Sequence, residues 1–192
     1  MIKKQNMVLM MLFLMGLFVI SSGIVGAQGE ITQADQNEPL VILGCALAIT
    51  IAGISAAIGL GIAGSSAVAV VAEKPNLFGK CLVLSVLPMT QAVYGLLTAI
   101  LLMLGSGILG GKLTSVMSGP AIGAAAVWIG LIVGLTGLSA INQGLVASSS
   151  ISSVGRNPDI AARGIIFTVQ TETIAIFGLL AGILLMSGLG LL

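Results

Sequence analysis

One carboxylate lies deep within an apolar stretch of this chain. Glu172 falls in the middle of the run from Gly164 to Leu192, and it is the only acidic residue of the sequence without a nearby polar segment. A charged side chain at the centre of a bilayer costs several kcal/mol unless it is neutralised, paired or given a cation, so an acid in this position is a candidate for function. The sequence predicts that Glu172 holds a proton, a partner or an ion.

Uncharged polar side chains occur at a similar depth in other apolar segments, namely Thr90, Gln91, Tyr94 and Gln143. Gln91 and Tyr94 share a helix face with Leu87, because residues three or four apart are neighbours on a helix. Pro88 removes one backbone donor, which frees the Leu84 carbonyl and loosens the next turn. These segments supply amide, hydroxyl and carbonyl oxygens at the level of the glutamate.

An oxygen set with a single carboxylate suits a hard monovalent cation. Oxygen ligands disfavour transition metals, which prefer His or Cys, and Ca²⁺ or Mg²⁺ sites usually recruit several carboxylates. The alternative is hydrogen bonding between helices around a protonated Glu172, to which Thr168, Thr171 and Thr173 would contribute. Na⁺ is the predicted ion, and H⁺ is the alternative.

The composition is that of an all-α membrane protein. The 192 residues are 57% hydrophobic and 7% charged, with a mean hydropathy of +1.20, whereas soluble domains have about 45–50% apolar and about 25% charged residues. Apolar segments of about 20 residues cross a bilayer as helices. A net charge of +1 without a basic cluster argues against binding to nucleic acid. Cys45 and Cys81 lack His or CxxC spacing and are expected in the core.

Four membrane helices are predicted over residues 40–72, 79–105, 119–154 and 161–190, separated by segments with Pro, Gly or charge. The basic residues near them are concentrated at two hairpin loops, 73–80 and 155–163, and are Lys74, Lys80, Arg156 and Arg163. Because cytoplasmic loops carry an excess of Lys and Arg, both loops are expected in the cytoplasm of a multi-pass cell-membrane protein. The loop over residues 106–118 is then external.

Residues 1–27 have the order of a secretory signal. Lys3 and Lys4 precede an apolar run and a small-residue segment that ends at Ala27, so the segment is either a cleaved signal peptide or a retained extra helix. Residues 28–39 are polar and acidic and are expected to form an exposed linker.

The second half of the chain repeats the first with a constant offset of 83 residues. The stretch that begins at Gly95 recurs at Gly178, and the same offset pairs Pro75 with Pro158. The repeat predicts two tandem helical hairpins in parallel orientation, over residues 40–105 and 119–192, an arrangement that suits stacking around an axis. Many secondary transporters instead contain inverted repeats. Met89 stands at the position of Glu172 in the first hairpin, so one acid remains per two hairpins.

Small residues are dense along the first and third predicted helices, among them Gly53, Gly59, Gly61, Gly130, Gly134 and Gly144. In lipid, small residues let helix backbones approach closely. They indicate either close packing within the chain or, as the density favours, an inner ring of copies with the bulkier second and fourth helices outside.

Three stretches surround the polar residues: Leu-Pro-Met-Thr-Gln-Ala-Val-Tyr-Gly at 87–95, Ala-Ile-Asn-Gln-Gly at 140–144, and Gly-Ile-Ile-Phe-Thr-Val-Gln-Thr-Glu-Thr-Ile-Ala-Ile at 164–176. They closely resemble the proteolipid ring subunit, known as the K or c subunit, of V-type and A-type rotary ATPases and ATP synthases. The resemblance covers residues 40–192. For the sodium-translocating members, it implies an ion held by the Leu87 carbonyl, Thr90, Gln91, Gln143 and Glu172, with Tyr94 hydrogen-bonded to the glutamate.

The resemblance implies a subunit with no catalytic activity of its own and no organic cofactor. It also implies a homo-oligomeric ring in the lipid bilayer, a stator membrane subunit with an arginine, and a central stalk subunit. Glu172 would carry its ion as the ring rotates, coupled to ATP hydrolysis or synthesis elsewhere. A stand-alone cation channel or transporter of four helices, and a structural scaffold, are the alternatives from other classes.

Overall fold

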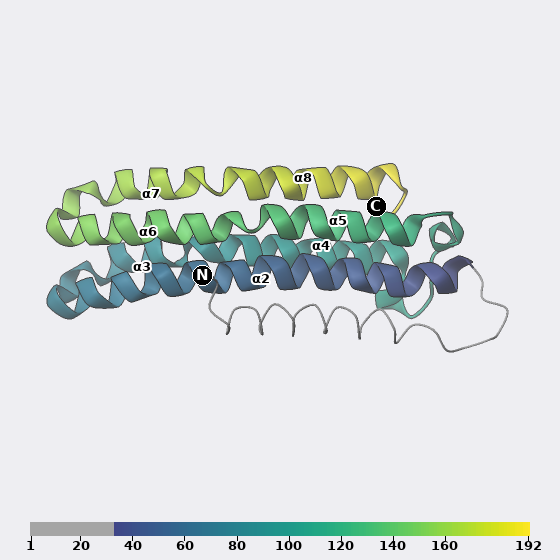
Figure 1. Cartoon of the computed structure of the whole chain (residues 1–192), viewed down its shortest axis with the longest axis horizontal. Helices are drawn as coiled ribbons and strands as arrows, with labels where there is room; N and C mark the ends of the chain where they lie inside the picture. Colours follow the sequence, from purple (N-terminus) through teal and green to yellow (C-terminus); the bar gives the residue numbers. More distant parts are fainter. Residues whose placement is uncertain (1–32) are drawn as a thin grey trace, which may run out of the picture. The chain divides into compact units, whose positions relative to one another are not determined.

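The computed structural model describes residues 33–192 and places them in helices joined by short turns (Figure 1). The α-helices are α2 (Gln33–Glu73), α3 (Phe78–Val86), α4 (Thr90–Ser106), α5 (Ile122–Thr136), α6 (Ser139–Arg156), α7 (Ala161–Gln170) and α8 (Thr173–Gly188). Short 3₁₀ turns lie at Pro75–Leu77, Leu87–Met89, Ile108–Gly110, Ser115–Ser118 and Pro158–Ile160. The signal segment predicted over residues 1–27 lies outside the described residues.

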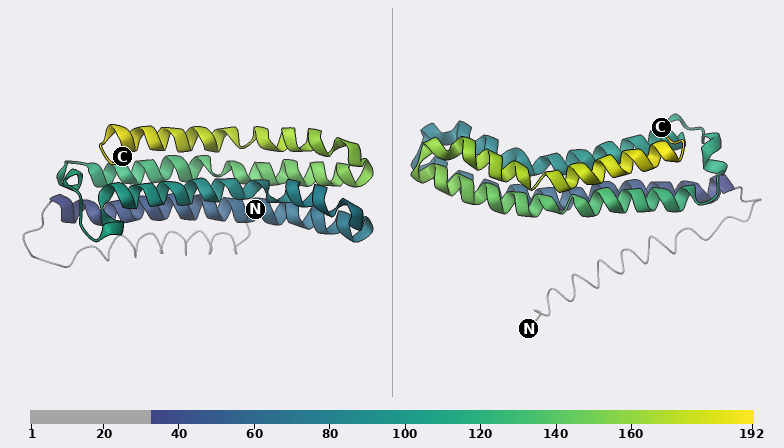
Figure 2. Two further views of the ribbon diagram at one scale, coloured as in Figure 1. Left: turned by 180° about the vertical axis from the view of Figure 1, so that it is seen from behind. Right: turned by 90° about the horizontal axis from the view of Figure 1, so that it is seen from above.

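Two helical hairpins stand side by side. In the right-hand view of Figure 2, α2 and the α5–α6 pair form one layer, and α3–α4 with α7–α8 form the other. Within residues 33–192, three helical spans are long and apolar enough to cross a membrane, and the α7–α8 pair, bent by 40°, makes a fourth when it is counted as one span. The predicted all-α fold of two tandem hairpins is confirmed.

Small residues bring the two hairpins into contact within the chain. A Cβ atom at Gly59 would collide with the Ala140 carbonyl, and one at Gly144 would collide with the backbone of Gly59. Farther along, a Cβ at Gly130 would collide with the Gly44 carbonyl. Such close approach replaces the hydrophobic drive that is missing between helices in lipid. Part of the glycine pattern is therefore explained inside one chain.

Gly144→Ala should separate α6 from α2, because the new methyl group would lie against the Gly59 backbone rather than a movable side chain. Overpacking of this kind costs about 1–3 kcal/mol. The purified protein should lose thermal stability relative to the parent chain. Gly53→Ala is the matched control, since a Cβ there meets open space within the described part of the chain. Equal melting temperatures for the two variants would contradict the close contact.

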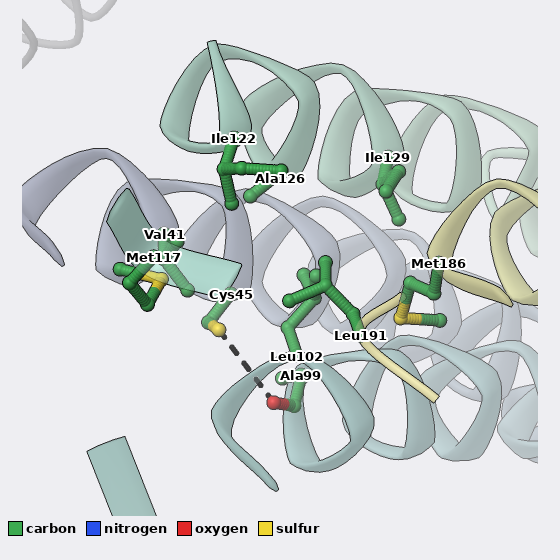
Figure 3. Packing of buried hydrophobic residues seen from close by; sticks show 10 residues of the cluster. All are labelled: Val41, Cys45, Ala99, Leu102, Met117, Ile122, Ala126, Ile129, Met186 and Leu191. Carbon is green, nitrogen blue, oxygen red and sulfur yellow. Dashed lines mark hydrogen bonds between the residues drawn. The ribbon is translucent and has the colours of Figure 1, made fainter. Parts of the chain in front are cut away.

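One apolar cluster fills the end of the bundle that holds the loop over residues 106–118 (Figure 3). Leu102, Met117, Ile129 and Met186 are fully buried there, and Cys45 donates from Sγ to the Ala99 carbonyl at 3.5 Å. Cys81 lies in a second cluster near the opposite end, with Leu84 and Ile151. Both cysteines are free and buried, as predicted for core residues.

From Gln33 onward, the residues predicted as an exposed linker over 28–39 belong to α2, and Gln33, Asp35 and Gln36 are exposed there. Asn37, in contrast, is buried. Its Nδ2 donates to the carbonyls of Met117 and Gly119, at 2.8 and 3.0 Å, and its Oδ1 accepts from the Gly123 N–H at 2.9 Å. The partners lie 80 residues or more away and hold this polar segment against the second hairpin.

The two loops at the opposite end are also tied together. Lys74 Nζ donates to the Gly155 carbonyl at 2.6 Å, and Lys80 Nζ donates to the Pro158 carbonyl at 2.9 Å. Both lysines of the first hairpin thus donate to carbonyls at the turn of the second. Gly155 lies in the last turn of α6, which leaves backbone acceptors without helical partners.

Candidate ion-binding site

In the described part of the chain, three of the four spans are interrupted near the middle of the bundle. The first break is the 3₁₀ turn Leu87–Met89, the second separates α5 from α6 at Gly137, and the third separates α7 from α8 just before Thr173. Pro88 accounts for the first break, because it can neither donate to nor fit a continuous helix. At the second, Ser55 of the unbroken α2 donates to the Gly137 carbonyl at 2.8 Å.

Glu172 lies at the third break, immediately before α8, and is only 8% exposed. Tyr94 Oη donates to its Oε1 at 2.6 Å, and Gln143 Nε2 donates to its Oε2 at 3.4 Å. The start of a helix carries a partial positive charge, which favours an anionic side chain there. The break thus places the acid between helices and gives both of its oxygens a donor.

The hydrogen bonds continue from Gln143 to α4. Gln91 Nε2 donates to Gln143 Oε1 at 2.8 Å, and both amide side chains are fully buried. Thr90 Oγ1 lies 3.1 Å from Gln91 Oε1 and 3.0 Å from the Leu87 carbonyl, to either of which it can donate. The structure brings together all six predicted site residues: Leu87, Thr90, Gln91, Tyr94, Gln143 and Glu172.

The Leu87 carbonyl also accepts the backbone N–H of Thr90, which closes the 3₁₀ turn. The turn thus directs this carbonyl toward Thr90, and the hydrogen bonds from Thr90 through Gln91 and Gln143 end at the one carboxylate. Among the described residues, no three His, Cys, Asp or Glu side chains are grouped so that they could hold a metal. The donor set of this site fits a hard monovalent cation better than a transition metal or a divalent ion.

The threonines near Glu172 do not join this set. Thr168 Oγ1 donates to the Gly164 carbonyl at 2.8 Å, and Thr171 Oγ1 donates to the Thr168 carbonyl at 2.8 Å. Thr173 is exposed. A hydrogen bond from a threonine hydroxyl to a carbonyl of its own helix often bends that helix. Thr171 therefore favours the break between α7 and α8 at which Glu172 lies.

Thr98 is a supporting residue that the sequence analysis did not identify. Its side chain is fully buried and donates to the Tyr94 carbonyl at 2.9 Å. It lies one helical turn beyond Tyr94, and that spacing is the only sequence signal that could have pointed to it.

Comparisons with known proteins agree with the duplicated architecture. The model of the ATP synthase C-subunit family matches the chain twice, over residues 43–102 and 127–185. The "A-type ATP synthase subunit K" of Methanocaldococcus jannaschii is 46% identical over 150 residues, which cover 77% of this chain and 63% of that relative. The chain therefore spans less than two thirds of the archaeal relative's length.

Two further relatives are matched over most of their own length. The "V-type sodium ATPase subunit K" of Enterococcus hirae is 37% identical over 153 residues, 78% of this chain and 93% of the relative. The 16 kDa proteolipid, or c-subunit, of the V-type proton ATPase of Nephrops norvegicus is 27% identical over 146 residues, 75% of this chain and 87% of the relative. The chain belongs to the ATP synthase C-subunit family, as a membrane proteolipid and not a catalytic component.

Proposed function

We propose that this chain is the ion-carrying rotor subunit of a V-type or A-type rotary ATPase or ATP synthase, and that Glu172 carries Na⁺. The series of hydrogen bonds that runs from Thr90 through Gln91 and Gln143 to Glu172, with the Leu87 carbonyl 3.0 Å from the Thr90 hydroxyl, is the observation on which the proposal rests. Leu87, Thr90, Gln91 and Gln143 would each contribute an uncharged oxygen, and Tyr94 would hold the carboxylate in place.

The hydrogen bonds of the site are compatible with both ions. As drawn in the structure, both oxygens of Glu172 accept, from Tyr94 Oη and from Gln143 Nε2, which is the arrangement expected beside a bound cation. In the H⁺ alternative the acid donates its own proton, either to Tyr94 Oη or, after the two amide groups rotate, to Gln143 Oε1, with Gln91 Oε1 accepting from Gln143.

The physical properties of the site suit a rotor. A bare carboxylate facing lipid would resist movement by several kcal/mol, whereas an ion-loaded or protonated Glu172 is neutral. Ions would therefore load and leave only beside a stator subunit, where an arginine can face the empty carboxylate. Copies of the chain would form the homo-oligomeric ring, and a central stalk subunit would link its rotation to ATP hydrolysis or synthesis. The hairpin loops over residues 73–80 and 155–163 would face the cytoplasm, and their excess of basic residues supports this orientation.

Sodium should protect Glu172 from a carbodiimide such as dicyclohexylcarbodiimide, which reacts with protonated carboxyl groups. If Na⁺ occupies the site, labelling in purified membranes should slow by about tenfold when Na⁺ is ten times its dissociation constant, because only the empty fraction reacts. The labelled position is identified by mass spectrometry of the extracted chain.

Potassium or choline at the same ionic strength is the control for a general effect of salt. If sodium fails to slow labelling at any pH while Glu172 is still modified, the chain carries H⁺ instead. If the carbodiimide does not modify Glu172 at all, the reagent does not reach this carboxyl group. The proposal that Glu172 is the ion carrier of a rotor then fails.

A further inference from the structure

Ser139, the first residue of α6, has a side-chain oxygen without a partner. Among the residues that the structure describes, Ser139 Oγ is the buried side-chain oxygen that makes no hydrogen bond. The residue as a whole is partly exposed, but this oxygen is covered by the chain itself, so lipid or another protein cannot supply its partner. An unpaired buried hydroxyl is costly, and in a native protein it indicates a functional role or a partner in another state.

Other hydroxyl groups at this level of the bundle have found internal partners. Thr136 Oγ1 donates to the Ile132 carbonyl of its own helix at 2.8 Å. Ser55 Oγ, from α2, donates to the Gly137 carbonyl at 2.8 Å. Ser139 makes neither kind of bond. Its hydroxyl is therefore an unused donor inside the bundle, two residues after the break between α5 and α6.

The packing of the Ile122–Arg156 span against α8 places Ser139 about one helical turn from Glu172. A Cβ atom at Gly178 would collide with Thr136 Oγ1, and Gln143 Nε2 donates to Glu172 Oε2. These two contacts define an antiparallel register. Ser139 follows Thr136 by three residues and precedes Gln143 by four, so the three share one helix face. Ser139 therefore lies between the two contacts, beside the glutamate.

The carboxylate of Glu172 has one strong donor and one weak donor. Tyr94 Oη donates to Oε1 at 2.6 Å, but Gln143 Nε2 lies 3.4 Å from Oε2. Hydrogen bonds from N–H to oxygen usually measure about 2.7–3.2 Å. A bound cation would compensate for the weak bond at Oε2. The empty carboxylate has no such compensation, and it needs a further donor because an unpaired buried charge is costly.

We propose that Ser139 is a positioning residue for ion release: when the cation leaves, the Glu172 carboxylate turns toward the start of α6 and accepts from Ser139 Oγ. The inference rests on the proposed function, because it assigns a donor to the empty form of the same site. In the loaded form, Tyr94 and Gln143 hold the carboxylate beside the ion. Ser139 thus stabilises the empty form alone, which lowers the affinity for sodium and favours its release.

Ser139→Ala tests this assignment in the assembled complex. The rate at which dicyclohexylcarbodiimide labels Glu172 is measured across a sodium series at fixed pH. The variant loses the donor of the empty form, so the half-protecting sodium concentration should fall about tenfold, as expected for one hydrogen bond to a charged group. Thermal stability in saturating sodium should not fall, since the hydroxyl has no partner in the described structure.

Ser55→Ala is the matched control, because Ser55 is fully buried and its hydroxyl is already bonded to the Gly137 carbonyl. This variant should lose thermal stability and keep the half-protecting sodium concentration of the parent chain. If Ser139→Ala left that concentration unchanged, Ser139 would only fill space. If it raised the concentration, Ser139 would serve the loaded form. Either result would overturn the inference and leave the rotor function standing. If sodium protects neither the parent nor the variant, the proposed sodium carrier fails, and the inference fails with it.

A structure of the complex in sodium-free buffer at alkaline pH gives a second measurement that needs no variant. In the copies of the chain beside the stator subunit, one oxygen of Glu172 should lie about 2.5–3.0 Å from Ser139 Oγ. A carboxylate that keeps its position beside Gln143 in these copies, with Ser139 Oγ still unpaired, would overturn the inference as well.

Discussion

Replacing Glu172 by Gln is expected to abolish ion-coupled ATP hydrolysis while leaving the subunit folded. Gln has the size of Glu and can still accept from Tyr94 Oη, so the bond at 2.6 Å has a neutral replacement. It cannot balance the charge of Na⁺ or take up H⁺. The sodium-stimulated activity should fall about 100-fold or more. A charge in a dry site is worth several kcal/mol, and each 1.4 kcal/mol of lost binding energy weakens ion binding about tenfold. Sodium-stimulated ATPase activity of the purified complex is the measurement.

Thr173→Val is the matched control, because Thr173 is the next residue, is exposed and lies outside the hydrogen-bonded set. It should retain activity and the mass of the complex. If Glu172→Gln kept sodium-stimulated hydrolysis, the acid would have no part in transport, and the scaffold interpretation would replace the rotor.

The fold could be predicted from the sequence because its signals are long and repeated. Apolar runs bounded by Pro, Gly and charge indicated four helices, and the predicted first span, 40–72, lies within α2 at Gln33–Glu73. The polar residues that the structure brings together with Glu172 could be singled out for a related reason, whereas the Leu87 carbonyl was suggested only by the family resemblance. Polar side chains are rare in such runs, so each one stands out, and the repeat places the α4 residues at the level of Glu172.

What the sequence did not reveal depends on contacts between distant segments. At the start of α2, Asn37 donates to the carbonyls of Met117 and Gly119, which follow it by 80 residues or more. At the break between α5 and α6, the Gly137 carbonyl accepts from Ser55 of another helix. The small residues had two interpretations. Gly59 and Gly144 support packing within the chain, whereas Gly61 faces open space among the described residues and is not explained by that packing.

Gln143→Leu should raise the sodium concentration that half-protects Glu172 from carbodiimide by about 10–100-fold, as is typical when a metal site loses a supporting group. The substitution removes the amide oxygen proposed as a ligand and the donor 3.4 Å from Glu172 Oε2. It also leaves Gln91 Nε2, which is fully buried, without its acceptor at 2.8 Å, and an unsatisfied buried donor costs about 1–3 kcal/mol. Labelling rates measured across a sodium series give the half-protecting concentration directly.

Thr98→Val separates loss of a ligand from loss of a buried hydrogen bond. Thr98 is as buried as Gln143, but its hydroxyl serves the Tyr94 carbonyl and offers nothing to the ion. Both variants should lower thermal stability, and only Gln143→Leu should shift the half-protecting sodium concentration. A shift of similar size in both would mean that sodium responds to general loosening of α4 and α6. No shift in Gln143→Leu would remove Gln143 from the ligand set and leave the cation to Glu172 and the oxygens of α4.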